Sequence, residues 1–329
     1  MKTDNTESSI SYFDLPYTTI KTQHIVYDDG YQDITLYRIA DGIFMAINDV
    51  HARTIPFSMY DMHTNPVIIN HCMDGRCEFS VSEDCYTYLG GEQTAISTRP
   101  SMTDFYYPTG KYYGIQIFML GDRISDVSEL YAIDIALLKE IYCSPDPLHI
   151  HRCQRHELKL WEDLHNAHEK GDVAEVRLYC LIALHSLCSY YDTGELSRQT
   201  FLTSTQIRIA KEAERIITED LSRHIPIREI AASFRVSETS MKNYFYAVYG
   251  SNISTYLSDK RMSEAAHLLS ETDLPIIEIS RRIGYVNQGK FAAVFKNAYG
   301  MKPLDYRRNA GLHLSSGSHN HHTSDKKAE

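Results

Sequence analysis

The chain of 329 residues lacks any apolar run near the roughly 20 residues that a membrane-spanning helix requires. Its first ten residues, MKTDNTESSI, contain no basic segment followed by an apolar stretch, so we expect no secretory signal. The seven cysteines are odd in number and form no CxxC pair, which argues against a disulfide framework. These absences predict a cytoplasmic protein with reduced thiols and no membrane contact.

Net positive charge, which nucleic-acid-binding domains commonly carry, is missing from the chain as a whole. The formal net charge is −10. The charge is unevenly distributed, however: residues 200–312 contain 16 Lys and Arg against 12 Asp and Glu, whereas the rest contains 17 against 31. Any binding of a polyanion is therefore expected in the C-terminal part, after an acidic N-terminal part.

The N-terminal part predicts strands. Residues 1–22 are polar and irregular, and we expect them to be disordered. Residues 23–122 alternate short apolar runs, such as VIINHC and YYGIQIFML, with turn signals such as DDG, MDG and LGG. This pattern predicts antiparallel strands joined by hairpins. Several such strands closing on themselves would form a small barrel or jelly roll.

Residues 123–193 carry apolar side chains at helical spacing, as in RHELKLWEDLHNAHEKG and DVAEVRLYCLIALHSLCSYY. A long apolar helix at this place can pair with its counterpart in a second chain. It can also pack on its own barrel, and one helix can do both. We predict a helical dimerisation segment and a homodimer. Residues 194–203 are predicted to form a polar linker and residues 204–310 a helical domain, and residues 311–329 are expected to be disordered.

One motif occurs twice in the helical C-terminal part. PIREIAASFRVSETSMKNYFYAVYG begins at Pro226, and PIIEISRRIGYVNQGKFAAVFKNAYG begins at Pro275. In each copy a proline can start a helix, an apolar stripe follows, and a second short helix ends at a glycine. Ser237 is a natural N-cap in the first copy, and Gly284 suits a left-handed turn in the second. Each copy therefore predicts a helix-turn-helix, and the residues between them predict one long connecting helix.

Two such units on a rigid connector can enter successive major grooves on one face of DNA, roughly 34 Å apart. The segment from about Thr203 to Arg308 resembles the DNA-binding domain of the AraC/XylS family of transcription regulators. The first copy matches that family loosely. The second copy carries its signature, EIS..IGY.NQ..F...FK...G..P..YR, at Ile279, Gly284, Tyr285, Phe291, Phe295, Lys296, Gly300, Pro303, Tyr306 and Arg307.

The resemblance implies a cupin-like effector-binding domain in the N-terminal portion, in agreement with the strand pattern. The expected fold is therefore α+β and multidomain. It consists of a cupin-like antiparallel β-barrel with a helical segment, followed by an all-α double helix-turn-helix domain. The resemblance further implies a transcription regulator that binds double-stranded DNA and responds to an unknown small-molecule effector. It favours an activator, which would work with RNA polymerase.

The second helix of each copy is expected to read DNA, so its outward side chains are the candidate contacts. In the first copy these are Ser237, Glu238, Thr239, Lys242, Asn243 and Tyr246, and in the second they are Val286, Asn287, Gln288, Lys290 and Ala293. Lys can donate to guanine and Asn can pair with adenine, whereas alanine can only contact a thymine methyl group. Arg261 is expected to brace the connecting helix. Phosphate contacts are expected from Arg281, Arg282, Lys296, Lys302, Arg307 and Arg308.

Four tyrosines are candidate effector contacts, because each combines a flat apolar face with a hydroxyl group. They are Tyr86, Tyr88, Tyr106 and Tyr112. Aromatic residues also favour strands for reasons of packing alone, so the same tyrosines are equally typical of a sheet without a ligand.

The alternative function is a cupin-type enzyme that carries a DNA-binding module. Metal-using cupins place several His and a Glu at close spacing, but the sequence around His63, His71, Cys72 and Glu78 contains no H-x-H followed by Glu. HIHRC, which ends at Cys153, has spacing compatible with a metal, but we expect it to lie beyond the strands. No Ser-His-Asp arrangement or phosphate-binding Gly loop is recognisable. We therefore predict no enzymatic activity, no catalytic residues, no cofactor and no metal.

Overall fold

The computed structural model describes residues 20–56, 66–98, 104–120, 129–189 and 200–317, with side chains as far as 310. It divides into two compact units, residues 1–204 and 205–329, and each is described by itself. The predictions for residues 1–19, 190–199 and 318–329 lie outside the described residues. Among the described helices, none has both the length and the apolar character needed to cross a bilayer.

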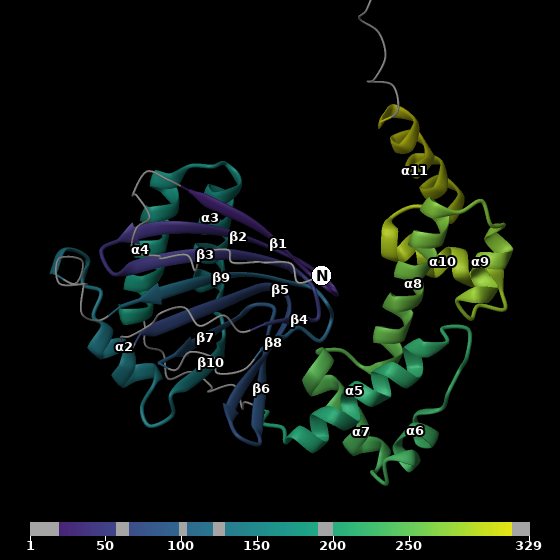
Figure 1. The fold of residues 1–329 in the computed structure, drawn as a ribbon, viewed down its shortest axis with the longest axis horizontal. Coiled ribbons are helices and arrows are strands. Elements are labelled where there is room, and N and C mark those ends of the chain that lie inside the picture. Colours follow the sequence, from purple (N-terminus) through teal and green to yellow (C-terminus); the bar gives the residue numbers. More distant parts are fainter. Residues whose placement is uncertain (1–19, 57–65, 99–103, 121–128, 190–199, 318–329) are drawn as a thin grey trace, which may run out of the picture. The chain divides into compact units, whose positions relative to one another are not determined.

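The first unit is built on an antiparallel sheet (Figure 1). Its hydrogen-bonded path runs β1-β2-β3-β9-β5-β7-β10; β6 pairs with β5, and β4 and β8 form a separate two-stranded sheet. The strands are β1 (Lys21–Tyr27), β2 (Gly30–Ala40), β3 (Ile43–His51), β4 (Thr54–Ile55), β5 (Val67–Ser82), β6 (Cys85–Gly90), β7 (Gln93–Ser97), β8 (Phe105–Tyr106), β9 (Tyr112–Met119) and β10 (Leu148–Arg152).

The prediction of antiparallel strands is confirmed, whereas a closed barrel is not. In the described part of the chain, β1 pairs with β2 alone and β10 with β7 alone, so the sheet has two open ends. The long strand β5 bends where its pairing with β9 shifts between Cys72 and Asp74. This irregularity directs its first half to β7 and its second half to the hairpin with β6.

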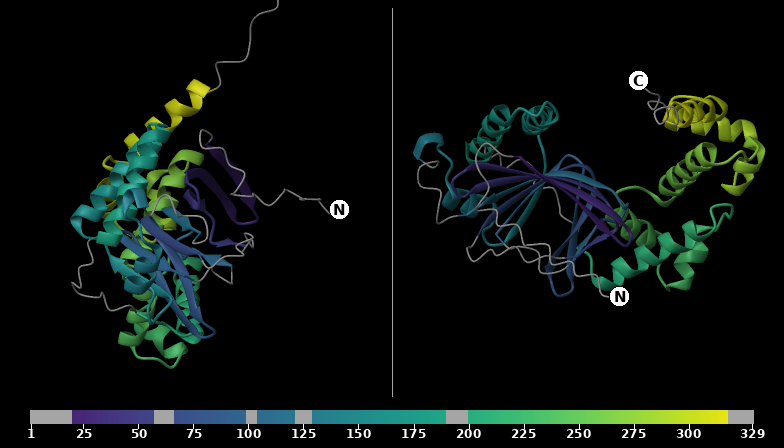
Figure 2. Two further views of the ribbon diagram at one scale, coloured as in Figure 1. Left: turned by 90° about the vertical axis from the view of Figure 1, so that its left-hand side faces the viewer. Right: turned by 45° about the horizontal axis from the view of Figure 1, so that its top comes forward.

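Helices cover one face of the sheet, as Figures 1 and 2 show. They are α2 (Ile135–Tyr142), α3 (Arg155–Glu169) and α4 (Val173–Ser189). Their apolar stripes pack on alternate residues of the strands, so Trp161, Leu164 and Leu184 share one buried cluster with Ile69 and Ile117. The helical spacing read from the sequence is thus confirmed for α3 and α4.

The region predicted as a helical dimerisation segment, residues 123–193, also contains a strand. Leu148–Arg152 forms β10 and pairs with β7 along its whole length. HIHRC therefore belongs to the sheet instead of lying beyond it. The strand depends on tertiary structure. Five residues between long helices are too few for a recognisable strand pattern, but they can pair with the edge of β7.

The second unit is entirely helical in its described part. Its helices are α5 (Ser204–Glu219), α6 (Ile227–Ser233), α7 (Glu238–Tyr249), α8 (Ile253–Glu271), α9 (Ile276–Arg282), α10 (Gln288–Tyr299) and α11 (Pro303–Gly317). Figure 1 shows α8 running from the α6–α7 pair to the α9–α10 pair. The predicted connecting helix is confirmed. The helical domain was predicted to end at residue 310, whereas α11 extends to Gly317.

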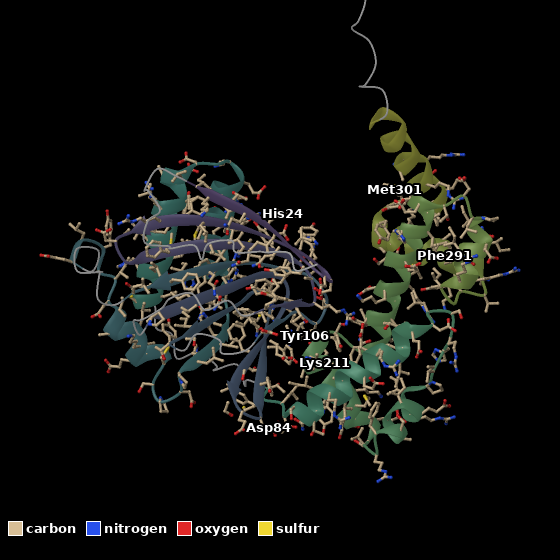
Figure 3. The ribbon with its side chains drawn as sticks, viewed as in Figure 1. His24, Asp84, Tyr106, Lys211, Phe291 and Met301 are labelled. Atoms are coloured by element: carbon tan, nitrogen blue, oxygen red, sulfur yellow. The ribbon has the colours of Figure 1, made fainter. Side chains whose placement is uncertain are left out.

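Two aromatic clusters stabilise the second unit. Around α10, Phe291 and Phe295 are fully buried against Ile279 and Leu269; Figure 3 marks Phe291. Around α7, Phe245 contacts the rings of residues 249 and 256, with ring centroids 4.5 and 5.3 Å away. Burying side chains of this size contributes about 1.5–3 kcal/mol each relative to leaving them in water.

Candidate nucleic-acid interface

The first helix-turn-helix consists of α6 and α7. Ser237 caps α7, and its hydroxyl oxygen accepts a hydrogen bond from the Ser240 backbone N–H at 3.0 Å. Gly250, with φ of 72°, ends the helix in the left-handed region. Met241, Phe245 and Val248 are buried, so one face of α7 is fixed against the unit and the opposite face is left exposed.

The exposed face of α7 contains the predicted DNA-contacting residues. Glu238, Thr239, Lys242, Asn243 and Tyr246 are all exposed. Tyr246 is 60% exposed, although it is large and aromatic. Lys242 lies 3.8 Å from the Glu238 carboxylate, an exposed pair one helical turn apart. Exposed pairs contribute little to stability, so Lys242 is available to bind a stronger anionic partner.

The second helix-turn-helix consists of α9 and α10, and its turn has one residue more than the first. Val286 is that additional residue, and it is fully exposed. Asn287 caps α10, and its side-chain oxygen accepts from the Lys290 backbone N–H at 2.9 Å. That bond uses one of the two lone pairs of the amide oxygen. Asn287 can still donate to a base, but a two-sided pairing with adenine would compete with the helix cap.

The other predicted DNA contacts of the second helix-turn-helix lie on the exposed side of α10. Gln288, Lys290 and Ala293 are exposed, while Phe291 and Phe295 face the core. Gln288 is thus the exposed side chain near the start of α10 that offers both a donor and an acceptor. Lys290 adds a charge, and Ala293 and Val286 add small apolar surfaces of the kind that fit a thymine methyl group.

The six predicted phosphate contacts fall into two groups. Five are exposed, and of these Arg282 pairs with Glu278 at 3.1 Å and Arg308 with Asp305 at 3.9 Å. Arg307 differs, because it is half-buried and its Nη2 donates to the Leu274 carbonyl at 2.6 Å. Arg307 therefore helps to hold the start of α9, and its contact with phosphate stays a prediction. The exposed five are Arg281, Arg282, Lys296, Lys302 and Arg308.

The two helix-turn-helix units are joined by more than α8. Arg261, in the middle of α8, donates from Nε to the Leu221 carbonyl at 2.9 Å and from Nη2 to the Arg223 carbonyl at 3.0 Å. Its guanidinium also lies 6.0 Å from the ring centre of Tyr285, in the turn of the second helix-turn-helix. The predicted bracing role of Arg261 is confirmed, and its partners link the loop before α6 to the turn before α10.

A buried polar pair joins α5 to α8 within the second unit, and the sequence does not reveal it. The Tyr256 hydroxyl donates to the Glu214 carboxylate at 2.9 Å, and both residues are buried. A buried carboxylate is tolerated only when it is hydrogen-bonded. The only sequence signal for this contact is a Glu on the apolar stripe of α5.

The four tyrosines predicted as effector contacts lie on three strands, β6, β8 and β9. Tyr86 and Tyr88 lie two residues apart on β6, and the Tyr88 hydroxyl donates to the Glu78 carboxylate. Tyr106 is half-buried on β8. Tyr112 on β9 is buried, and its burial raises its pKa well above the ordinary value. Effector binding by these residues therefore stays a prediction.

Comparison with known proteins agrees with the repeat. The family described as "Helix-turn-helix domain" matches residues 230–309. The chain is 36% identical over 84 residues to the uncharacterized HTH-type transcriptional regulator YdiP of Escherichia coli. It is 31% identical over 84 residues to the arabinose operon regulatory protein of Salmonella typhimurium. The C-terminal segment is an AraC-type helix-turn-helix domain.

The AraC-type domain accounts for a limited part of the chain. The two matches cover 26% of this chain and 28% and 30% of the relatives, so less than a third of each relative is spanned. Among solved structures, the C-terminal domain of AraT from Geobacillus stearothermophilus is 33% identical. That similarity covers 31% of this chain and 84% of AraT's, with a TM-score of 0.30.

We expect Lys242→Ala and Gln288→Ala each to weaken specific DNA binding by about 1–3 kcal/mol, because each removes one hydrogen-bonding side chain from an exposed recognition helix. A gel-shift titration measures the change. Lys170→Ala, which removes an exposed lysine that pairs with Glu175 in the first unit, is the control and should leave affinity unchanged. Unchanged affinity in both test variants would remove these assignments.

Proposed function

We propose that the protein is a sequence-specific DNA-binding transcription regulator whose α7 and α10 enter two successive major grooves. The observation that carries the proposal is the pair of capped recognition helices, each buried on one face and exposed on the other, on one helical unit. Arg261 and α8 hold the pair together. A fixed separation allows one chain to read two patches of one DNA face.

The relatives' names support regulation and favour activation. Besides the arabinose operon regulatory protein, the chain is 29% identical over 147 residues to the HTH-type transcriptional activator CfaD of Escherichia coli, of which it covers 53%. Activation requires a productive contact with RNA polymerase, which is accordingly a proposed partner. DNA binding would place the protein in the cytoplasm with the chromosome. No part of the proposal requires enzymatic activity.

The first unit is the proposed effector domain. Its sheet with helices on one face gives a scaffold of the kind that a cupin-like effector domain uses, although the described strands leave it open. Helix α4 exposes Leu178 and Ile182, which are 58% and 46% exposed and four residues apart on one face. An exposed apolar pair on an otherwise packed helix supports the proposed homodimer through α4.

The function is tested by selecting binding sites from random DNA with the full-length protein and measuring affinity for the selected site and for random DNA at rising salt. We expect selected sites to contain two conserved patches about one helical turn apart, and the preference to persist as salt weakens both affinities. Absence of any preference over random DNA would contradict the proposal. A thermal-shift screen of metabolites against the same protein then tests for the effector.

A further inference from the structure

Three potential metal-binding side chains come together where β10 ends and α3 begins. His151 is on β10, Cys153 follows the strand, and Glu157 is the third residue of α3. One donor atom from each lies within 4.8 Å of the other two. The cluster belongs to the first unit and takes no part in the proposed DNA contacts.

Local hydrogen bonds hold these residues in position. The Glu157 carboxylate accepts from the Gln154 backbone N–H at 2.7 Å, as part of the cap of α3, and its other oxygen lies 3.0 Å from His151 Nε2. The Cys153 backbone N–H donates to the Glu92 carbonyl at 2.9 Å. The backbone around all three donors is therefore fixed by the sheet edge and the helix cap.

The cluster is shielded from water and contains an unused polar atom. Cys153 is 7% exposed, and the side chains of His151 and Glu157 are 18% and 14% exposed. Within the described part of the chain, His151 Nδ1 is buried and makes no hydrogen bond. A buried polar atom without a partner costs about 1–3 kcal/mol, and a species bound at this ring nitrogen would offset that cost.

We propose that His151, Cys153 and Glu157 bind a divalent transition metal, for which Zn²⁺ is the best match. Imidazole, thiolate and carboxylate are the three side-chain donors that zinc uses. Bonds of about 2.0–2.3 Å at a tetrahedral ion place its donor atoms about 3.3–3.7 Å apart. On binding, the Cys153 thiol loses its proton to solvent, and the fourth position stays open to water.

Neighbouring strands support the thiol. His71 on β5 and His151 on β10 both lie opposite Thr94 on the intervening strand β7. The Thr94 hydroxyl lies 3.0 Å from both His71 Nδ1 and Cys153 Sγ, and His71 Nδ1 lies 3.6 Å from that sulfur. Trp161 of α3 stacks on His71 at 4.8 Å. These contacts orient Cys153 and place one more imidazole 3.6 Å from its sulfur.

A redox role suits Cys153 less well. This residue is only 7% exposed, so oxidants have little access to its thiol. A metal, by contrast, would connect the end of β10 to the start of α3. Metal binding to the folded state should then raise the stability of the first unit.

The test is a titration of the metal-free, full-length protein with Co²⁺, which reports a thiolate ligand through its near-ultraviolet charge-transfer absorption. We expect one Co²⁺ per chain, displacement by Zn²⁺, and a higher melting temperature with Zn²⁺. Cys153→Ser should abolish the charge-transfer band. Cys85→Ser, which changes a half-buried thiol on β6, is the matched control and should retain it.

Glu157→Gln keeps the experiment decisive if Cys153→Ser fails to fold. Glutamine can still accept from the Gln154 N–H, so the cap of α3 and the metal-free melting temperature should be preserved. Its affinity for Co²⁺ should fall at least about tenfold. The proposal is overturned by a wild-type protein without the band, by a band that survives in Cys153→Ser, or by unchanged affinity in Glu157→Gln. None of these measurements involves DNA, so their outcome is independent of the proposed function.

Discussion

Replacing Gly284 by alanine should destabilise the second unit by about 3 kcal/mol. Gly284 has φ of +82°, and a Cβ atom there would lie 2.7 Å from the Leu221 carbonyl oxygen and 3.0 Å from that of Ser222. Both neighbours are backbone atoms, which cannot rotate away. The left-handed backbone costs about 1–2 kcal/mol for a side chain, and forced overpacking adds about 1–3 kcal/mol.

Comparison with the first helix-turn-helix distinguishes the cost of the left-handed backbone from the cost of overpacking. Arg235 lies at the position of the first repeat that corresponds to Gly284, and its φ of 56° is also left-handed. A side chain is therefore tolerated in this turn when space is available. The glycine of the second turn is required by the close approach of the loop around Leu221, so Gly284 marks a contact between the two helix-turn-helix motifs.

Gly300→Ala is the matched control for this prediction. Gly300 has φ of +74°, but a Cβ atom there would meet nothing within 4 Å. The Gly300→Ala substitution should lower the free energy of unfolding by only about 1–2 kcal/mol, which is the cost of the left-handed backbone alone. Hydrogen exchange of peptides from α8 to α10 measures the loss of stability of each variant, Gly284→Ala and Gly300→Ala, in the full-length protein. The only tryptophan is Trp161, in the first unit, so its fluorescence should not change in either variant. Equal losses in the two variants would contradict the proposed close contact.

Local sequence signals predicted the second unit well. Pro226, Ser237, Gly250 and Gly300 flank or cap helices as expected, because a cap depends on residues within one turn of itself. The apolar stripes also identified the buried faces, since a period of 3.6 residues leaves few choices for which side of a short helix is buried.

What the sequence could not predict depends on distant partners. β10 is a strand because β7 has a free edge beside it, and nothing within its five residues states that. The hydrogen bond from Arg307 to the Leu274 carbonyl joins residues 33 positions apart, so the sequence does not reveal it. HIHRC alone shows spacing compatible with a metal in the sequence, and bringing Glu157 beside His151 and Cys153 requires both the sheet edge and the helix that follows. The closure of the sheet is likewise a property of strand order, which alternation alone does not specify.

Phe295→Ala should be the most destabilising single change in the second helix-turn-helix, at about 3–5 kcal/mol. The ring is fully buried, and the rings of Phe291, Tyr299 and Tyr306 lie 4.7 to 5.7 Å from its centre. Removing it opens a cavity where α10 meets α11. Because this cluster is distinct from the one around Phe245, the loss should be confined to one half of the unit.

Hydrogen exchange distinguishes a local loss from a global one. In Phe295→Ala, peptides from α9, α10 and α11 should exchange much faster, whereas peptides from α6 and α7 should keep most of their protection. Lys296→Ala, an exposed neighbour on the same helix, is the control and should change stability by less than about 0.5 kcal/mol. The Phe295→Ala variant would retain only the first recognition helix, so its DNA affinity would show how much the second recognition helix contributes to binding. Equal acceleration in α7 would mean that Arg261 and α8 make the two helix-turn-helix units unfold as one.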